Sequence, residues 1–120
     1  MNNDAVFLRH FLVAIQRIEG YAVVGHEQFL RETRWQDAII RQIEIVGEAA
    51  KYISPELRWR YPHVDWRAPT AMRNILIQKY ADVDLTIGWN ATESALPALT
   101  ANVEDILDRE PDLQLRPDEE

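Results

Sequence analysis

The chain has no cysteine, which excludes disulfide bonds, thiolate catalysis and zinc sites built on cysteine. It also has no apolar run near the roughly 20 residues that a membrane-spanning helix needs. The first residues, Met1-Asn2-Asn3-Asp4, lack the basic segment that begins a signal peptide. From these absences we expect a cytoplasmic protein that has no membrane partner.

Motifs of the common enzyme classes are missing as well. The four glycines stand apart, so the chain has no glycine-rich phosphate loop. Its three histidines, His10, His26 and His63, are widely separated, and none pairs with a carboxylate at the spacing of the H-E-x-x-H zinc motif. We therefore expect no metal ion and no cofactor.

Positive charge is scarce overall but not in the middle of the chain. The formal net charge is −7, which by itself argues against a nucleic-acid partner because phosphate binding depends on Lys and Arg. Residues 51–79, however, carry six Lys and Arg against two acids, whereas residues 80–120 carry two Arg against eleven acids. Because salt screens charges beyond about 10 Å, the basic segment can still bind phosphate locally. A solvated helix face explains the same charges.

What the sequence does have is helical periodicity. Its 120 residues with 47% hydrophobic content fit one domain with its own core. Apolar side chains recur three and four residues apart, first from Leu8 to Ile18 and last from Leu85 to Ile106. We predict an all-α antiparallel bundle of about five helices over residues 1–110. A frayed acidic tail is expected at residues 111–120.

The first two predicted helices are separated by a loop. Gly20 ends the first helix, and Gly25-His26 lies in the loop that follows. Thr33-Arg34-Trp35-Gln36 has the form of a capping box, in which the first and last side chains bind free backbone amides, so a second helix begins there. This helix runs to about Ile53 with apolar residues on more than one face, which indicates that it is either central or shared with a partner.

Capping residues and prolines place the other helices. Ser54, followed by a proline, caps a short third helix, and Asp65 caps a fourth. Asp84 caps the fifth. Pro97 lies within this last helix and lacks a backbone N–H, so we expect a kink or break near residues 94–96.

One polar cluster within the basic segment is a candidate site. Arg73-Asn74 and Gln78-Lys79-Tyr80 lie on the predicted fourth helix. The planar guanidinium with its five donors suits Arg73 to a phosphate group. The purely structural interpretation is that Arg73 pairs with an acid such as Glu48 and that Tyr80 packs in the core.

A longer pattern surrounds this cluster. It consists of the run QDAIIRQIEIVGEAAK at residues 36–51 and of shorter matches farther along the chain: Ser54-Pro55-Glu56-Leu57, Tyr61-Pro62, Trp66-Arg67, Met72-Arg73-Asn74, Tyr80, Val83-Asp84 and Trp89. In this order and spacing the pattern, which covers about residues 5–105, resembles the HepT-like toxin branch of the HEPN superfamily.

The resemblance implies a helical domain that forms a homodimer. It also implies an Arg-x4-His-x-Tyr motif from each subunit in a shared cleft that cleaves RNA without a metal ion. The implied partner is a minimal nucleotidyltransferase antitoxin, which neutralises the toxin by transferring AMP to the motif tyrosine. In this chain the motif arginine is Arg73, the polar residue after it is Asn74 and the tyrosine is Tyr80. Arg67 and Lys79 are candidate contacts to the RNA backbone.

The position of the motif histidine is occupied by Gln78. Imidazole titrates near neutral pH, so it can take a proton from the 2′-hydroxyl or give one to the leaving oxygen. A carboxamide does neither, and losing a general acid or base typically lowers a rate by on the order of 10²–10⁴. The hypothesis is therefore an impaired or inactive ribonuclease, with His63 as a less favoured substitute base.

Helix geometry adds a constraint, because each residue turns an α-helix by about 100°. Arg73 and Tyr80 share a face, whereas Arg73 and Gln78 are about 140° apart on an ideal helix. Convergence on one atom needs a distorted helix end, a long reach by the arginine, or a two-fold axis that combines two chains. Glu44 and Glu48, one turn apart on the second helix, either orient Arg73 or are solvated.

Two alternatives stand beside the toxin-type ribonuclease. One is a non-catalytic HEPN protein that binds its nucleotidyltransferase partner or RNA without cleavage. The other is a nucleotide- or RNA-binding helical module with no toxin role. Restoring histidine at position 78 separates the first alternative from a ribonuclease, and AMP transfer to Tyr80 separates the second from both.

Overall fold

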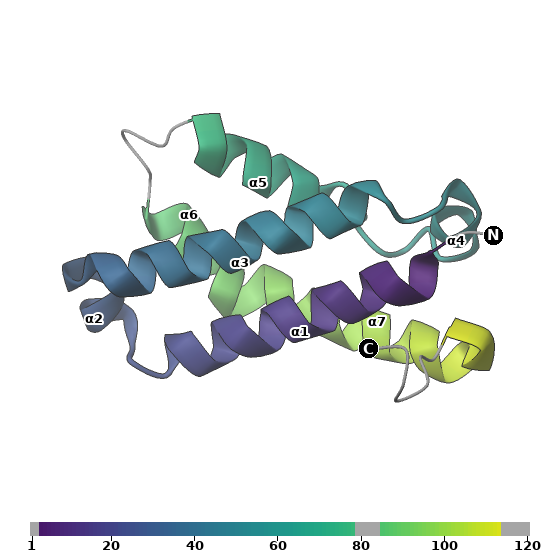
Figure 1. The fold of residues 1–120 in the computed structure, drawn as a ribbon, viewed down its shortest axis with the longest axis horizontal. Coiled ribbons are helices and arrows are strands. Elements are labelled where there is room, and N and C mark those ends of the chain that lie inside the picture. Colours follow the sequence, from purple (N-terminus) through teal and green to yellow (C-terminus); the bar gives the residue numbers. More distant parts are fainter. Residues whose placement is uncertain (1–2, 79–84, 114–120) are drawn as a thin grey trace.

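The structure is a computed structural model that describes residues 3–78 and 85–113, with the backbone alone at residues 75–78 and 87. It consists of helices joined by short turns (Figure 1). No strand occurs among these residues, which confirms the predicted all-α fold. The elements are α1 (Asp4–Ala22), α2 (His26–Arg31), α3 (Thr33–Lys51), α4 (Pro55–Arg60), α5 (Ala68–Gln78), α6 (Leu85–Asn90), a π-helical segment (Ala91–Ala95), α7 (Leu96–Arg109) and a 3-10 turn (Pro111–Leu113).

The long helices are antiparallel neighbours with α3 in the middle. Helix α3 packs against α1 on one side and α5 on the other, and α1 also contacts α7 (Figure 1). A helix with neighbours on several sides needs apolar residues on more than one face. The position of α3 between α1 and α5 thus explains why its apolar residues lie on more than one face.

The core lies between α1, α3 and α7. Phe11 of α1, Ile43 and Val46 of α3, and Val103 and Ile106 of α7 are each at most 1% exposed. Burying one large apolar side chain contributes about 1.5–3 kcal/mol. This core therefore fixes α3 firmly, and α3 supplies one wall of the candidate site.

The end of the first helix differs from the prediction. Helix α1 continues through Gly20 to Ala22, although the sequence suggests that Gly20 ends it. A single exposed glycine costs a helix only about 1 kcal/mol, and the next residue, Tyr21, packs its ring 6.5 Å from that of Trp35. The chain turns instead at Gly25, whose φ of 90° favours glycine.

Helix α2 occupies the place where the sequence predicts a loop around His26. Phe29, in the middle of this helix, is fully buried and its ring centroid lies 5.2 Å from that of Trp89. Phe29 is the one buried residue of this six-residue helix, and a single buried side chain gives no helical periodicity in the sequence. That is why the sequence pattern missed it.

The predicted capping box at the start of α3 is wrong. The N-cap residue is Glu32 instead of Thr33, which is the first residue of the helix. No side chain caps this end of α3. The amide of Gln36 donates a 2.9 Å hydrogen bond to the carbonyl of Phe29, so this side chain ties α3 to α2. Gln36 therefore binds the backbone of another helix instead of capping its own.

Two other caps are confirmed. Ser54 precedes α4, and its Oγ accepts a 3.1 Å hydrogen bond from the backbone N–H of Leu57. The same hydroxyl donates to Oδ2 of Asp4 at 2.6 Å, which joins the beginnings of α1 and α4. Asp65 accepts from the backbone N–H of Ala68 at 3.1 Å, at the start of α5.

The break that Pro97 predicts is confirmed. The π-helical segment Ala91–Ala95 separates α6 from α7, and the proline lies in the first turn of α7. The missing N–H of the proline and its ring prevent regular α-helical bonding to the preceding turn. The fifth helix of the prediction is therefore α6, the π-helical segment and α7 in succession.

Two predictions lie partly outside the described residues. Asp84, the expected cap of the last helix, is not described, and neither are residues 114–120 of the predicted acidic tail. At the beginning of that tail, the N–H of Leu113 donates a 2.9 Å hydrogen bond to the carbonyl of Glu110. None of the described helices is long and apolar enough to cross a membrane.

Candidate functional site

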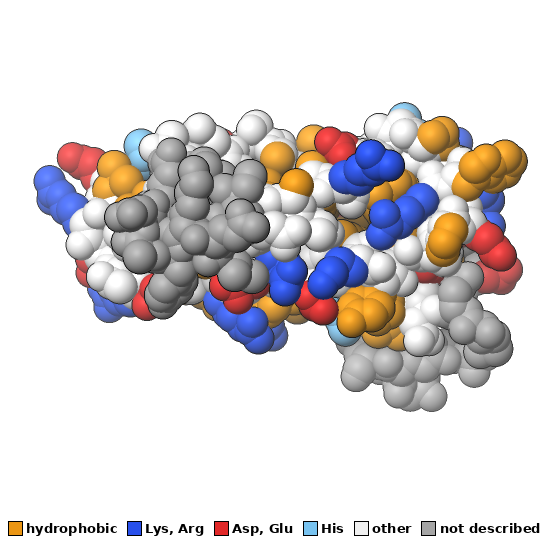
Figure 2. Space-filling view, turned by 90° about the horizontal axis from the view of Figure 1, so that it is seen from above, with side chains coloured by type: hydrophobic (Ala, Val, Ile, Leu, Met, Phe, Trp, Pro, Cys, Tyr) orange, Lys and Arg blue, Asp and Glu red, His pale blue; other side chains and the backbone are white. Residues whose placement is uncertain are grey.

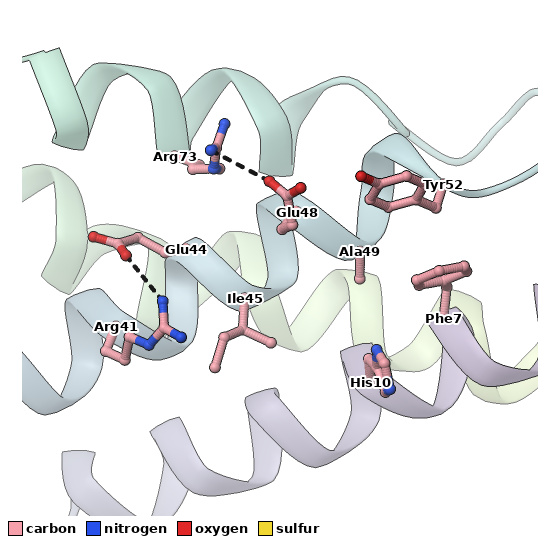
Figure 3. Close-up of a pocket in the computed structure, with 9 residues that line it drawn as sticks. All are labelled: Phe7, His10, Arg41, Glu44, Ile45, Glu48, Ala49, Tyr52 and Arg73. Carbon is pink, nitrogen blue, oxygen red and sulfur yellow. Dashed lines mark hydrogen bonds and ion pairs between the residues drawn. The ribbon is translucent and has the colours of Figure 1, made fainter.

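Arg73 lies on α5 with its guanidinium turned toward α3 (Figure 3). Its Nη2 is 3.3 Å from Oε2 of Glu48, and its Nη1 donates a 3.0 Å hydrogen bond to Oδ1 of Asn74. The pairing of Arg73 with Glu48, which the purely structural interpretation predicts, is therefore present. With 22% of its side chain exposed, Arg73 is half-buried and is held by these two side chains.

The position of Arg73 depends on the absence of a side chain at Gly47. A Cβ atom added at Gly47 would lie 2.5 Å from Cβ of Arg73 and 2.8 Å from the carbonyl oxygen of Pro69. The hydroxyl of Thr70 donates a 3.0 Å hydrogen bond to the carbonyl of Gly47. The backbones of α3 and α5 thus meet closely at Gly47, and this contact places the side chain of Arg73 against α3.

Arg73 lines a cavity of about 390 Å³ that is bounded by α1, α3 and α5 (Figure 3). The upper limit of the cavity is α5 and the lower limit is α1, with α3 as its floor. A volume of this order is typical of small-ligand sites. The lining residues are Phe7, His10, Arg41, Glu44, Ile45, Glu48, Ala49, Tyr52 and Arg73.

One end of the cavity is aromatic. The rings of Phe7 and Tyr52 stack with their centroids 5.0 Å apart and an interplanar angle of 20°. The ring of His10 meets Phe7 edge-on, with centroids 5.6 Å apart. Tyr52 is nevertheless 56% exposed, so it has surface left for another flat group.

The charged side chains of the cavity are already paired with each other. Arg41 lies 3.4 Å from Glu44, and Glu48 meets both Arg73 and Lys51, the latter at 3.8 Å. Glu44 is therefore a partner of Arg41, while Glu48 is the acid that orients Arg73. Such partly exposed pairs contribute about 0–1 kcal/mol each, so they can be rearranged by a ligand at small cost.

Several predicted site residues cannot be placed in this cavity. Gln78 is the last residue of α5, and its side chain lies outside the described part of the structure. Lys79 and Tyr80 lie outside it altogether. Their roles therefore stay predictions.

Arg67 and His63 lie apart from Arg73. Both line a second, more open hollow beside the start of α5, together with Asp65, and neither lines the cavity of Arg73. The histidine that shares a cavity with Arg73 is His10. The substitute base suggested from the sequence, His63, is thus not brought together with Arg73.

Sequence reasoning assigned no role to the ring-bearing residues of the lining, Phe7, His10 and Tyr52. Phe7 and His10 lie three residues apart on α1, which puts them on one face, and this spacing is the signal that could have paired them. Nothing in the sequence links them to Tyr52, which follows the end of α3. The association arises because α1 and α3 run antiparallel.

Much of the basic segment serves the fold. Arg58 donates hydrogen bonds to the carbonyls of Ile53 and Ala50 at the end of α3, where a cation also offsets the helix dipole. Arg60 lies 2.7 Å from Glu110. Figure 2, viewed over α5, shows Lys and Arg side chains on this face interspersed with hydrophobic and a few acidic groups. This face therefore carries a mixture of side-chain types.

No metal site is evident in the part of the chain that the structure describes, because no three His, Asp or Glu side chains gather closely enough there. The structure is thus an all-helical domain in which Arg73 lines a cavity that has aromatic rings at one end. The chain matches the family model described as "Ribonuclease HepT-like" over residues 11–106. It belongs to the HepT-like ribonuclease family.

Curated relatives agree with this assignment. The chain is 38% identical over 104 residues to a protein of Methanocaldococcus jannaschii whose name combines a gamma-glutamylcyclotransferase with an RNase, and the match covers 86% of this chain and 47% of that protein. The chain thus spans about half the length of that relative. It is 33% identical over 99 residues to the "Probable ribonuclease HepT" of Thermococcus cleftensis, covering 82% of this chain and 90% of that one.

A third relative matches along nearly its whole length. It is a protein of Caldanaerobacter subterraneus named as an RNase, 31% identical over 114 residues, with 92% of this chain and 99% of that protein covered. No solved structure matches the chain.

Proposed function

We propose that this chain is a toxin-type, metal-independent endoribonuclease module whose cutting centre contains Arg73, Asn74 and the residue at position 78. Membership of the HepT-like ribonuclease family is the observation that carries the proposal. The geometry of Arg73 supports it, since Glu48 and Asn74 hold the guanidinium at the edge of a ligand-sized cavity. A fixed guanidinium stabilises charge that develops on a phosphate.

The proposed reaction is transfer within the RNA chain itself. The 2′-oxygen attacks the adjacent phosphorus, the bond from phosphorus to the 5′-oxygen breaks, and one proton leaves the 2′-hydroxyl while another reaches the 5′-oxygen. Arg73 stabilises the negative charge on the non-bridging oxygens. The proton transfers need a group that titrates near neutral pH, which is the role of the family histidine.

Gln78 supplies no such group, so we expect the chain as it stands to cleave RNA slowly or not at all. Replacing Gln78 with His should raise cleavage by on the order of 10²–10⁴. The measurement is cleavage of a mixed RNA pool in the presence of EDTA by the two forms side by side. Gln78→Asn, which keeps a carboxamide, is the matched control and should stay at the starting level.

We propose further that the protein is a homodimer and that a minimal nucleotidyltransferase antitoxin modifies Tyr80. In this reaction the tyrosine oxygen attacks the α-phosphorus of ATP and pyrophosphate leaves. Incubation with the cognate nucleotidyltransferase and ATP should add one AMP to each chain in intact-mass analysis. Tyr80→Phe should abolish the addition, whereas Tyr52→Phe should keep it. Addition to the Tyr80→Phe variant would contradict the assignment.

A second candidate function rests on one specific observation, the carboxamide at position 78. A protein that retains the fold and binds RNA or the nucleotidyltransferase without cleavage would tolerate glutamine there. In that case Gln78→His gives no gain of cleavage, while AMP transfer to Tyr80 still occurs. Absence of both activities would favour a helical module that binds RNA or nucleotides without a toxin role.

A further inference from the structure

The cavity bounded by α1, α3 and α5 has aromatic rings at one end. Its volume of about 390 Å³ is typical of small-ligand sites. The rings of Phe7 and Tyr52 lie nearly parallel at one end, and Tyr52 is 56% exposed. Figure 3 shows both rings bordering one end of the cavity, Arg41 and Glu44 at the other end, and Arg73 on the upper side.

Exposed aromatic rings beside arginines are the usual platform for unpaired nucleobases. Bases of single-stranded RNA stack on Tyr, Phe and His side chains, and their edges meet hydrogen-bonding groups of the protein. The cavity offers the same combination: a ring pair, Phe7 and Tyr52, the imidazole of His10, and the polar heads of Arg41 and Glu44.

The charge balance of the cavity favours a base over a free phosphate. Its two arginines face two glutamates, and each guanidinium already contacts a carboxylate. A doubly charged phosphate in the recess would therefore meet two carboxylates as well as two cations. A flat neutral ligand with both donors and acceptors avoids this repulsion and can bind carboxylate and guanidinium alike.

We infer that this cavity is a subsite for one unpaired nucleobase of the RNA substrate, with the ring of Tyr52 as its stacking platform. The inference rests on the proposed ribonuclease function and names how that site selects its substrate. Because Arg73 lines the same cavity, we place the ribose and phosphate of this base on the side of the guanidinium. The subsite thereby selects single-stranded RNA, whose bases are free to leave the stack.

Binding to two matched RNAs tests the subsite directly. The protein with Gln78 is suited to this measurement because slow cleavage leaves the RNA intact. A short labelled oligoribonucleotide is compared with a chain of equal length that lacks its bases, by fluorescence anisotropy. We expect the base-containing RNA to bind about tenfold more tightly, as the loss of a stacked base predicts.

Variants assign this preference to Tyr52. Tyr52→Ala should remove most of the preference for the base-containing RNA. Tyr52→Phe, which keeps the ring, should retain this preference. The control is Trp59→Ala, because Trp59 is 82% exposed on α4 and does not line the cavity. Equal binding of the two RNAs by the unmodified protein, or a preference that survives Tyr52→Ala, would overturn the inference. Failure to bind either RNA would overturn it too.

A free mononucleotide offers the same base and ribose as the RNA. Competition with AMP, GMP, CMP and UMP shows whether the cavity binds the base of a free mononucleotide or a base within RNA. We expect mononucleotides to displace the oligoribonucleotide only at concentrations far above its Kd, since they lack the neighbouring phosphates. Displacement by one of them at a concentration near that Kd would contradict the assignment to RNA.

The subsite and the ribonuclease proposal fail in different ways. Cleavage by the Gln78→His form without any base preference would remove the subsite and leave the ribonuclease. A base preference that depends on Tyr52, without cleavage by the Gln78→His form, would keep the subsite and remove the ribonuclease.

Discussion

Arg58 and Arg73 come from the same basic segment, but the fold uses them differently. Arg58 donates to the carbonyls of Ile53 and Ala50 and so closes the end of α3. Arg73 meets a carboxylate and an amide side chain at the edge of a cavity. Arg58 is bound to backbone carbonyls, which belong to the fold, whereas Arg73 is bound to two side chains, which a ligand can rearrange at small cost. Local charge in the sequence therefore overestimates the charge that is free to bind RNA.

Substitution of Arg73 should have a larger effect on cleavage than substitution of Arg58 or Gly47. In the Gln78→His form, Arg73→Gln should lower cleavage by on the order of 10²–10³, the typical cost of removing one donor that stabilises transition-state charge. Its stability should change little, because the ion pair it loses is half-exposed. Rates on a defined oligoribonucleotide and urea unfolding check both parts.

Arg58→Gln in the same background is the matched counterpart. Its unfolding free energy should fall by about 1–3 kcal/mol, since hydrogen bonds from a charged donor are lost, while the rate per folded molecule stays unchanged. Equal loss of rate in the two variants would break the distinction between them.

A smaller effect is expected where α3 and α5 touch. Gly47→Ala places a Cβ 2.5 Å from Cβ of Arg73 and 2.8 Å from a backbone oxygen, so the helices must separate. We expect a loss of about 1–3 kcal/mol of stability together with reduced cleavage by the Gln78→His form. Thermal unfolding and cleavage rates measure these two effects.

The control for this substitution lies on α1. A Cβ at Gly20 meets nothing within 4 Å, so Gly20→Ala should stabilise the helix by about 0.5–1 kcal/mol and leave cleavage unchanged. If both glycine variants were stabilised alike, the close contact at Gly47 would not be what positions Arg73.

The sequence could predict the elements whose signals are local. The caps at Ser54 and Asp65 and the break before Pro97 follow from short-range chemistry, and the structure has them. The sequence could not predict α2, which is too short to show a period, nor the use of Gln36, whose amide found an acceptor in the carbonyl of Phe29. Tertiary partners decided these points.

The candidate site divides in the same way. Arg73 and its partner Glu48 could be proposed from residue type and helix spacing, and they meet in the structure. The cavity could not, because Phe7 and His10 of α1 and Tyr52 after α3 come together only through antiparallel packing. Separations of more than forty residues leave no periodic trace in a sequence.

We propose that the residue at position 78 decides whether this HepT-like domain cleaves RNA. The most direct test is cleavage of a mixed RNA pool with EDTA present by the Gln78 and Gln78→His forms, with Gln78→Asn beside them. We expect the histidine form to cleave on the order of 10²–10⁴-fold faster than the other two forms. Equal rates for all three forms, whether fast or absent, would contradict it.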